Sequence, residues 1–250
     1  MRPLVLCSND DGIHSSLLNQ LVVSLEAVAE VLVVAPERQR SAGSHAITLH
    51  KPLRLLEVAP NRYSLSGTPV DCVYLGMLKL APRPPSLVIS GINDGYNLGT
   101  DVFDSGTVAA AIEGALRGSL GVALSMAPIP DDPDSAVQVC HDFIARLLER
   151  RAAASPDDPL MRPGTVLNVN LPANGNTELR WTRLGRRTYK DDVQERSDPR
   201  GRPYYWIGGG PTGHDDVENS DCVVIAEGIN SVTPLHLDVT DHGLVKTPPW

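Results

Sequence analysis

Short apolar runs alternate with helical patterns along roughly the first 150 residues of the chain. Four runs are almost continuously apolar, which is typical of strands buried on both faces of a sheet: Leu4–Cys7, Val31–Ala35, Leu87–Ser90 and Gly121–Ser125. Between and after them, apolar residues recur three and four positions apart, and this spacing predicts amphipathic helices over residues 17–29, 69–78, 107–116 and 137–151. The alternation predicts an α/β fold with a mainly parallel sheet flanked by helices.

The pattern changes near residue 155, where Ser155–Pro159 has the composition of a linker. We therefore divide the chain into a core, residues 1–155, and a β-rich part, residues 156–250, that contributes one or more last core strands. Strands are predicted at residues 166–169, 178–183, 204–207, 222–227 and 231–237, and a mobile charged loop at 191–202. Five of the 11 aromatic residues lie between positions 181 and 206 of the second part, so we expect this part to make most contacts between subunits: Trp181, Tyr189, Tyr204, Tyr205 and Trp206.

Composition narrows the class of protein. The chain has 250 residues, with 22 Lys and Arg against 30 Asp and Glu, which gives a formal net charge of −8. The net negative charge argues against a protein that binds duplex DNA, because such proteins normally carry a basic surface. The 4% content of aromatic residues also leaves few side chains on which single-stranded bases could stack. The four cysteines are far apart and form no zinc motif, so we expect reduced thiols in the core. With no long apolar stretch, we expect a cytoplasmic protein without a membrane partner.

Oxygen-bearing side chains follow three of the predicted strands. Asp10 and Asp11 come directly after the first strand, and Ser41 and Asn93 lie in the segments after the second and third. In open α/β folds, ligands bind at the carboxyl edge of the strands, so these residues converge if the three strands are neighbours. A set of oxygens without His or Cys favours Mg²⁺, Mn²⁺ or Ca²⁺ over Zn²⁺. Taken alone, Asn9–Gly12 reads more simply as a strand-to-helix turn.

A second candidate site is the start of a helix of small residues. Ser105, Gly106 and Thr107 place no bulky side chain in its first turn, whose free N–H groups could hold a phosphate oxygen. The same residues would also be expected if Ser105 only capped the N-terminus of the helix and no phosphate were bound. Neither a Walker loop nor a dinucleotide-binding glycine motif is present.

Five motifs in this order closely resemble the SurE family of survival phosphatases, also called 5′/3′-nucleotidases. They are Ser8–His14, Val33–Ser41, Ser66–Val73, Ser90–Gly99 and Asp104–Ala111. Two positions depart from the family pattern: Ser15–Leu18 stands where Ala-Pro-Gly-Ile is usual, and Asp104 where an aromatic residue is common. Neither departure touches a residue that the resemblance assigns to the metal.

The resemblance implies a Rossmann-like core whose β-rich C-terminal part is exchanged between subunits, giving a homodimer or a dimer of dimers. It places one divalent cation per subunit, Mg²⁺, Mn²⁺ or Ca²⁺, on Asp10, Asp11, Ser41 and Asn93. The implied substrates are nucleoside 5′- and 3′-monophosphates, and short polyphosphate. We expect Asp10 and Asp11 to be catalytic. We expect the phosphate of the substrate to be oriented by Ser105, Gly106 and Thr107. Asn9 is expected to contact either this phosphate or one of the two carboxylates. Whether Asp11 also accepts a proton stays open.

Two other functions are compatible with these residues. An aspartyl-phosphate phosphatase also uses an Asp after a first strand, although such enzymes usually separate two carboxylates by one residue, whereas Asp10 and Asp11 are adjacent. A regulatory protein could bind metal and nucleotide without turning substrate over.

Overall fold

The structure is a computed structural model, and it describes residues 2–128, 132–155, 157–189, 193–207 and 212–246. Nine strands of this part form one sheet, in the order β3-β4-β2-β1-β5-β6-β7-β13-β8. The strands are β1 (Leu4–Ser8), β2 (Glu30–Pro36), β3 (Leu55–Ala59), β4 (Arg62–Leu65), β5 (Leu87–Asp94), β6 (Leu120–Met126), β7 (Thr165–Leu171), β8 (Leu179–Trp181), β9 (Arg187–Tyr189), β10 (Val193–Ser197), β11 (Pro203–Ile207), β12 (Thr212–His214) and β13 (Asn230–His236).

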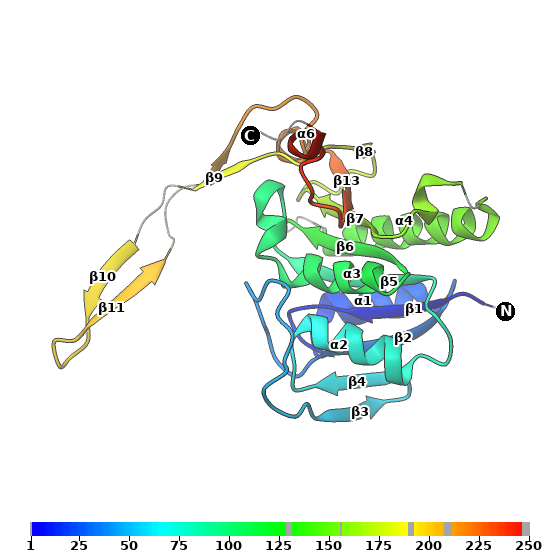
Figure 1. Cartoon of the computed structure of the whole chain (residues 1–250), viewed down its shortest axis with the longest axis horizontal. Coiled ribbons are helices and arrows are strands. Elements are labelled where there is room, and N and C mark those ends of the chain that lie inside the picture. Colours follow the sequence, from blue (N-terminus) through cyan, green and yellow to red (C-terminus); the bar gives the residue numbers. More distant parts are fainter. Residues whose placement is uncertain (1, 129–131, 156, 190–192, 208–211, 247–250) are drawn as a thin grey trace.

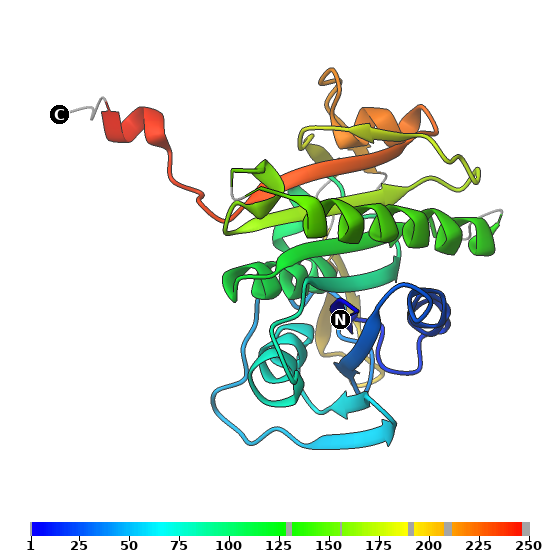
Figure 2. The same ribbon diagram turned by 90° about the vertical axis from the view of Figure 1, so that its right-hand side faces the viewer.

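Helices cover both faces of the sheet, which confirms the predicted fold class (Figures 1 and 2). The helices are α1 (Ser16–Leu25), α2 (Pro69–Leu75), α3 (Gly106–Leu116), α4 (Pro133–Ala153), α5 (Asp221–Ala226) and α6 (His242–Lys246), with a π-helical turn η1 (Gly76–Leu80) and two 3₁₀ turns η2 (Gly99–Phe103) and η3 (Pro159–Met161). None of the described helices is long and apolar enough to cross a lipid bilayer.

The central strands are buried on both faces because their residues alternate between two cores. On β1, Val5 and Cys7 face the core under α1 and α4, whereas Leu4 and Leu6 face the core under α2. Strands β4, β2, β1, β5, β6 and β7 run parallel where they pair. All four cysteines are buried and free, as expected of core thiols.

Small residues let α3 lie close to the sheet. A Cβ at Gly114 would overlap the side chain of Val88 on β5, and Ala110 and Ala111 are fully buried. This close approach fixes the direction of α3, and therefore the place of its first turn at the carboxyl edge of the strands.

Two predictions for the second half of the chain were wrong. Residues 222–227 were expected to form a strand because Val223, Val224 and Ile225 favour strands, but residues 222–226 lie in α5 and Glu227 caps its C-terminal end. The hydroxyl of Ser220 caps this helix by accepting from the N–H of Val223 at 3.3 Å. Residues 193–197, expected within a mobile loop, form β10, which pairs with β11 in an antiparallel hairpin.

That hairpin stands apart from the body of the protein (Figure 1). All residues of β10 and β11 are exposed, whereas β13 pairs with β7 of the same chain inside the main sheet. The division of the chain at residue 155 stays a prediction. Strands β7, β8 and β13 of the second part join the same sheet as the strands of the first part. The exchange of the β-rich C-terminal part between subunits also stays a prediction.

Candidate active site

The sheet order brings the predicted cation ligands to one edge. Strand β1 pairs with β2 on one side and β5 on the other, so the three strands are neighbours, as the prediction required. Asp10 and Asp11 follow β1, Ser41 follows β2, and Asn93 lies at the end of β5. The register places Ser8 opposite Ser90, which aligns the ends of β1 and β5.

The turn after β1 is fixed by Asn9. Its amide donates to the carbonyl of Gly12 at 3.0 Å and accepts from the Gly12 N–H at 3.1 Å. Gly12 has a φ of +100°, and a Cβ there would lie 3.3 Å from the carbonyl oxygen of Pro36, so the turn requires glycine. The amide groups of Asn9 thus hold the backbone that carries both carboxylates.

The two carboxylates lie in an environment that disfavours negative charge. Burial raises the pKa of Asp10 to about 6, the hydrogen bond from Thr107 opposes the shift, and the charge of Asp11 adds to it. Burial also raises the pKa of Asp11, and the charge of Asp94 adds to that increase. One oxygen of Asp11, Oδ2, is buried without a hydrogen-bond partner, whereas Oδ1 accepts from Gln39 at 3.3 Å. A cation beside Asp10 and Asp11 would relieve both costs.

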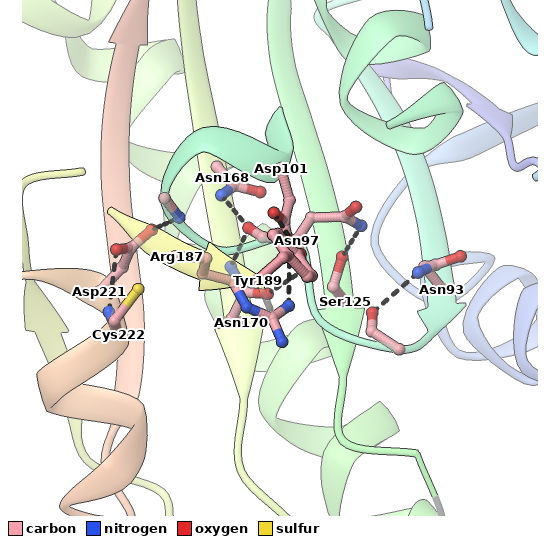
Figure 3. A network of polar contacts seen from close by, with 12 residues as sticks. Asn93, Asn97, Asp101, Ser125, Asn168, Asn170, Arg187, Tyr189, Asp221 and Cys222 are labelled. Atoms are coloured by element: carbon pink, nitrogen blue, oxygen red, sulfur yellow. Dashed lines mark hydrogen bonds and ion pairs between the residues drawn. The ribbon is translucent and has the colours of Figure 1, made fainter. Parts of the chain in front are cut away.

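The two neutral residues lie at or after the ends of the strands on either side of the one that precedes these carboxylates. Asn93 donates its amide N–H to the carbonyl of Gly95 at 2.8 Å, which leaves its Oδ1 oxygen available (Figure 3). The backbone of the next residue, Asp94, lowers the pKa of Asp11 and so opposes part of the increase that burial causes. Ser41 is exposed, and the backbone N–H of its neighbour Arg40 donates to the carbonyl of Asp10 at 2.7 Å.

These four residues fit a hard divalent cation. They offer oxygens only, and one carboxylate oxygen is buried and unpaired. In the part of the chain that the structure describes, no three His, Cys, Asp or Glu side chains gather in a metal-binding group. A cation here would therefore be held by two carboxylates and by neutral oxygens, which suits Mg²⁺ or Mn²⁺ better than Zn²⁺.

The first turn of α3 packs directly against Asp10. A Cβ on Gly106 would lie 3.2 Å from the Cβ of Asp10, so a larger residue would push the helix and Asp10 apart by a few tenths of an ångström. Thr107 donates its hydroxyl to Oδ1 of Asp10 at 2.6 Å, and Ser105 caps the helix by accepting from the Val108 N–H at 3.1 Å. The N–H groups of Gly106 and Thr107 have no acceptor among the described residues, and they remain as the donors of the first turn.

Sequence reasoning missed a buried amide network beside the site (Figure 3). The backbone N–H of Asn97 donates to Asn170 at 2.9 Å, and its carbonyl accepts from Asn168 at 2.8 Å and from Asn170 at 3.0 Å. Its side chain donates to Ser125 at 2.7 Å. The network holds the segment that links Asn93 to Ser105. The signal available in the sequence was the pair of asparagines in an otherwise apolar strand, β7.

Two aspartates fix the rest of that segment to the second half of the chain. Asp221 is fully buried and accepts from the N–H groups of Gly99 at 2.8 Å and Gly185 at 2.7 Å. Asp101 accepts from Arg187 at 2.6 Å and from the hydroxyl of Tyr189 at 2.5 Å (Figure 3). The segment before α3 is thereby bound to β9, which leads into the projecting hairpin.

A sequence model of one protein family, described as Survival protein SurE, matches residues 5–191. The chain belongs to the SurE family. A 5'-nucleotidase SurE of Anaeromyxobacter sp. strain Fw109-5 is 52% identical over 247 residues, covering 97% of this chain and 93% of the relative. A 5'-nucleotidase SurE of Sorangium cellulosum is 46% identical over 242 residues, covering 96% and 92%.

The fold of the chain is also similar to that of a solved structure. The crystal structure of the SurE protein from Aquifex aeolicus shares 36% sequence identity and a TM-score of 0.83, with 98% of each chain covered. The family resemblance carried by the five motifs is thus confirmed over nearly the whole chain.

Proposed function

We propose that this SurE family member is a divalent-metal-dependent phosphomonoesterase that hydrolyses nucleoside 5′-monophosphates to nucleoside and phosphate. The relatives named 5'-nucleotidase SurE support the class of reaction and the nucleotide substrate. We include nucleoside 3′-monophosphates and short polyphosphate as further substrates, because the donors at the start of α3 would recognise a terminal phosphate and not a base.

The observation that carries the proposal is the contact between Thr107 and Asp10. It places the open first turn of α3 against a carboxylate of the candidate cation site, 2.6 Å from hydroxyl to carboxylate oxygen. A phosphomonoesterase needs this adjacency, because positive charge must act on the phosphate that the protein holds.

Each residue has a defined task in this reaction. Asp10 and Asp11 would hold the cation, with Ser41 and Asn93 as neutral ligands. When bound, the cation would lower the pKa of water and neutralise charge on the phosphoryl oxygens. The N–H groups of Gly106 and Thr107 orient the phosphate for in-line attack. Asn9 fixes the turn that carries both carboxylates, and Thr107 fixes Asp10 as well as contributing its N–H.

The test is a panel of substrates and metals on the purified chain. We expect phosphate release from adenosine 5′-monophosphate with Mn²⁺ or Mg²⁺, loss of activity after exhaustive chelation, and recovery when metal is restored. The 3′-monophosphate and tripolyphosphate arms define the range of substrates. Full activity after chelation would contradict the cation model.

The same assay separates the two alternatives. Acid quenching during turnover would trap a covalent phosphate on an aspartyl-phosphate enzyme, and we expect none. Tight binding of nucleotide with no phosphate release at any metal would indicate a regulatory protein instead.

We also propose that the chain acts as a homodimer or a dimer of dimers. The hairpin β10–β11 supports this, because its aromatic side chains are exposed on an element that stands clear of the body (Figure 1). The side chain of Ile207 is 91% exposed and that of Trp206 is 59% exposed. A second subunit that accepted the hairpin would remove this apolar surface from water.

A further inference from the structure

The segment that carries Ser41 is held by polar contacts. Residues 37–54, between β2 and β3, contain no helix or strand, and most of them are exposed. Ala42 and Ser44 have φ values of +54° and +45°, a left-handed conformation that residues other than glycine keep only where their surroundings hold it. The position of Ser41 therefore depends on what anchors the residues just after it.

One anchor lies at the start of α3. The N–H of Ser44 donates to the carbonyl of Asp104 at 3.0 Å, and its hydroxyl donates to the carbonyl of Phe103 at 2.7 Å. Both acceptors directly precede Ser105, so this contact ties the segment to the backbone that leads into α3.

The second anchor is a hydrogen bond between side chains, which joins the segment to the body of α3. His45 Nε2 lies 3.0 Å from Oε2 of Glu113, whose side chain is only 2% exposed. The other oxygen of Glu113 accepts from Arg117 at 2.5 Å, and the guanidinium of Arg117 lies 3.8 Å from the centre of the Tyr74 ring. Burial alone would raise the pKa of Glu113, but the hydrogen bonds from His45 and Arg117 outweigh it, so the pKa is lowered and the group is a carboxylate.

The helix thus contacts two parts of the candidate site. Thr107 in its first turn binds Asp10, and Glu113 lies six residues later, about 9 Å along the same rigid axis. One element therefore sets both the orientation of a carboxylate and the position of the segment that supplies Ser41.

We propose that His45 is a positioning residue: by pairing with Glu113 it holds residues 41–45 on α3 and keeps Ser41 beside Asp10 and Asp11. The consequence for the cation rests on the proposed function, because it requires Ser41 to be a ligand. The attachment of residues 41–45 to α3 does not depend on whether Ser41 is a ligand. Arg117 already pairs with Glu113, so His45 is not needed merely to neutralise that charge.

The attachment is tested by amide hydrogen exchange of the metal-free protein. We expect His45→Ala to speed exchange of residues 44–48 about tenfold, the usual worth of one hydrogen bond to a charged group. His45→Gln, which keeps a donor toward Glu113, should restore much of the protection. The matched control is His50→Ala, an exposed histidine of the same segment.

The consequence for the site is tested by titrating Mn²⁺ into the same variants by calorimetry, without substrate. His45→Ala should raise the dissociation constant about tenfold. Glu113→Gln should do the same, whereas His50→Ala should leave it unchanged. Thermal unfolding of the metal-free variants identifies any that fail to fold, and His45→Gln then serves as the folded comparison.

Two results would overturn the proposal. Unchanged exchange at residues 44–48 in His45→Ala would show that the contact between His45 and Glu113 does not hold the segment. Faster exchange with unchanged Mn²⁺ affinity would show that the segment does not position a ligand. Neither measurement uses turnover. The proposal for His45 can therefore fail while the phosphatase assignment stands, and the phosphatase assignment can fail while the proposal for His45 stands.

Discussion

Thr107 donates its side-chain hydroxyl to Asp10, so the helix assigned to the phosphate also holds a carboxylate assigned to the cation. The assignment of Ser105, Gly106 and Thr107 to substrate alone is therefore incomplete. Replacements in the first turn of α3 should therefore have two kinds of effect. Some should disturb Asp10 as well as the helix, and others should disturb only the helix.

Thr107→Ala should weaken binding of both cation and phosphate. Asp10 would lose a hydrogen bond to a charged group, which is worth about 1.5–3 kcal/mol, so Mn²⁺ affinity should fall about tenfold or more. Thr107→Ser keeps the hydroxyl and should stay close to wild type. Ser105→Ala removes a helix cap worth about 1 kcal/mol but no contact to Asp10, so it should leave Mn²⁺ affinity largely intact. Calorimetric titration of the three variants checks this, and equal affinities throughout would contradict it.

Asp11→Asn should bind the cation poorly and turn over slowly. The replacement keeps the shape of the side chain but removes a charge next to Asp10, which should cut turnover by about 10²-fold or more, as when one strong electrostatic stabiliser is lost. Phosphate release at saturating Mn²⁺, with a parallel calorimetric titration, measures both effects. Near wild-type activity in this variant after chelation would show that the reaction does not depend on a cation at this position.

The elements of the central sheet were predictable because their sequence signals are local. A strand buried on both faces is a continuous apolar run, and Thr68-Pro69 marks the start of α2 by a cap and a first-turn proline. The adjacent positions of Asp10 and Asp11 after β1 were predictable for the same reason. That these two residues lie at the same edge of the sheet as Asn93 follows once β1 and β5 pair.

The missed features depend on contacts between distant parts of the chain. The partners of Asn97 lie 28 to 73 residues away, and no local pattern pairs them. Residues 222–227 favour a strand by composition, yet the cap at Ser220 and the left-handed Gly228 that follows make them a helix. The pairing of His45 with Glu113 was invisible for the same reason, because 68 residues separate them.

Asn170→Ala should destabilise the protein more than its size suggests. It would leave the buried N–H of Asn97 without an acceptor and remove one of two donors from the Asn97 carbonyl. A buried polar group left unpaired costs about 1–3 kcal/mol, which for a chain of this size lowers the melting temperature by a few degrees per kcal/mol. Gln20→Ala, an exposed amide on α1, is the control and should change stability by less than about 0.5 kcal/mol. Equal melting temperatures for the two variants would contradict a structural role of the network.

The ion pair at Glu113 should make stability depend on acidity. The pKa of Glu113 is lowered from 4.5, so its contribution is fully present above pH 4.5 and is lost as the pH falls through the folded value. The groups that face it are His45 from the segment after β2, Arg117 just after α3, and Tyr74 of α2, which lies beside Arg117. Wild type should therefore lose more stability than Glu113→Gln between pH 5 and pH 3 in urea unfolding. Parallel curves for the two proteins over that range would contradict the assignment.

Removal of the hairpin apolar surface should dissociate the subunits. Trp206 and Ile207 belong to a strand whose residues are all exposed in the single chain, and exposed apolar clusters of this kind mark contacts between proteins. We expect light scattering to give wild type at about twice or four times the 26.9 kDa of one chain at micromolar concentration. Trp206→Ser combined with Ile207→Thr should shift the mass toward one chain while far-ultraviolet circular dichroism stays unchanged, because neither residue packs in the core. The control is Val23→Ser, which removes an exposed apolar side chain from α1, away from the hairpin, and should leave the mass unchanged. A monomeric wild type with full phosphatase activity would refute this assembly.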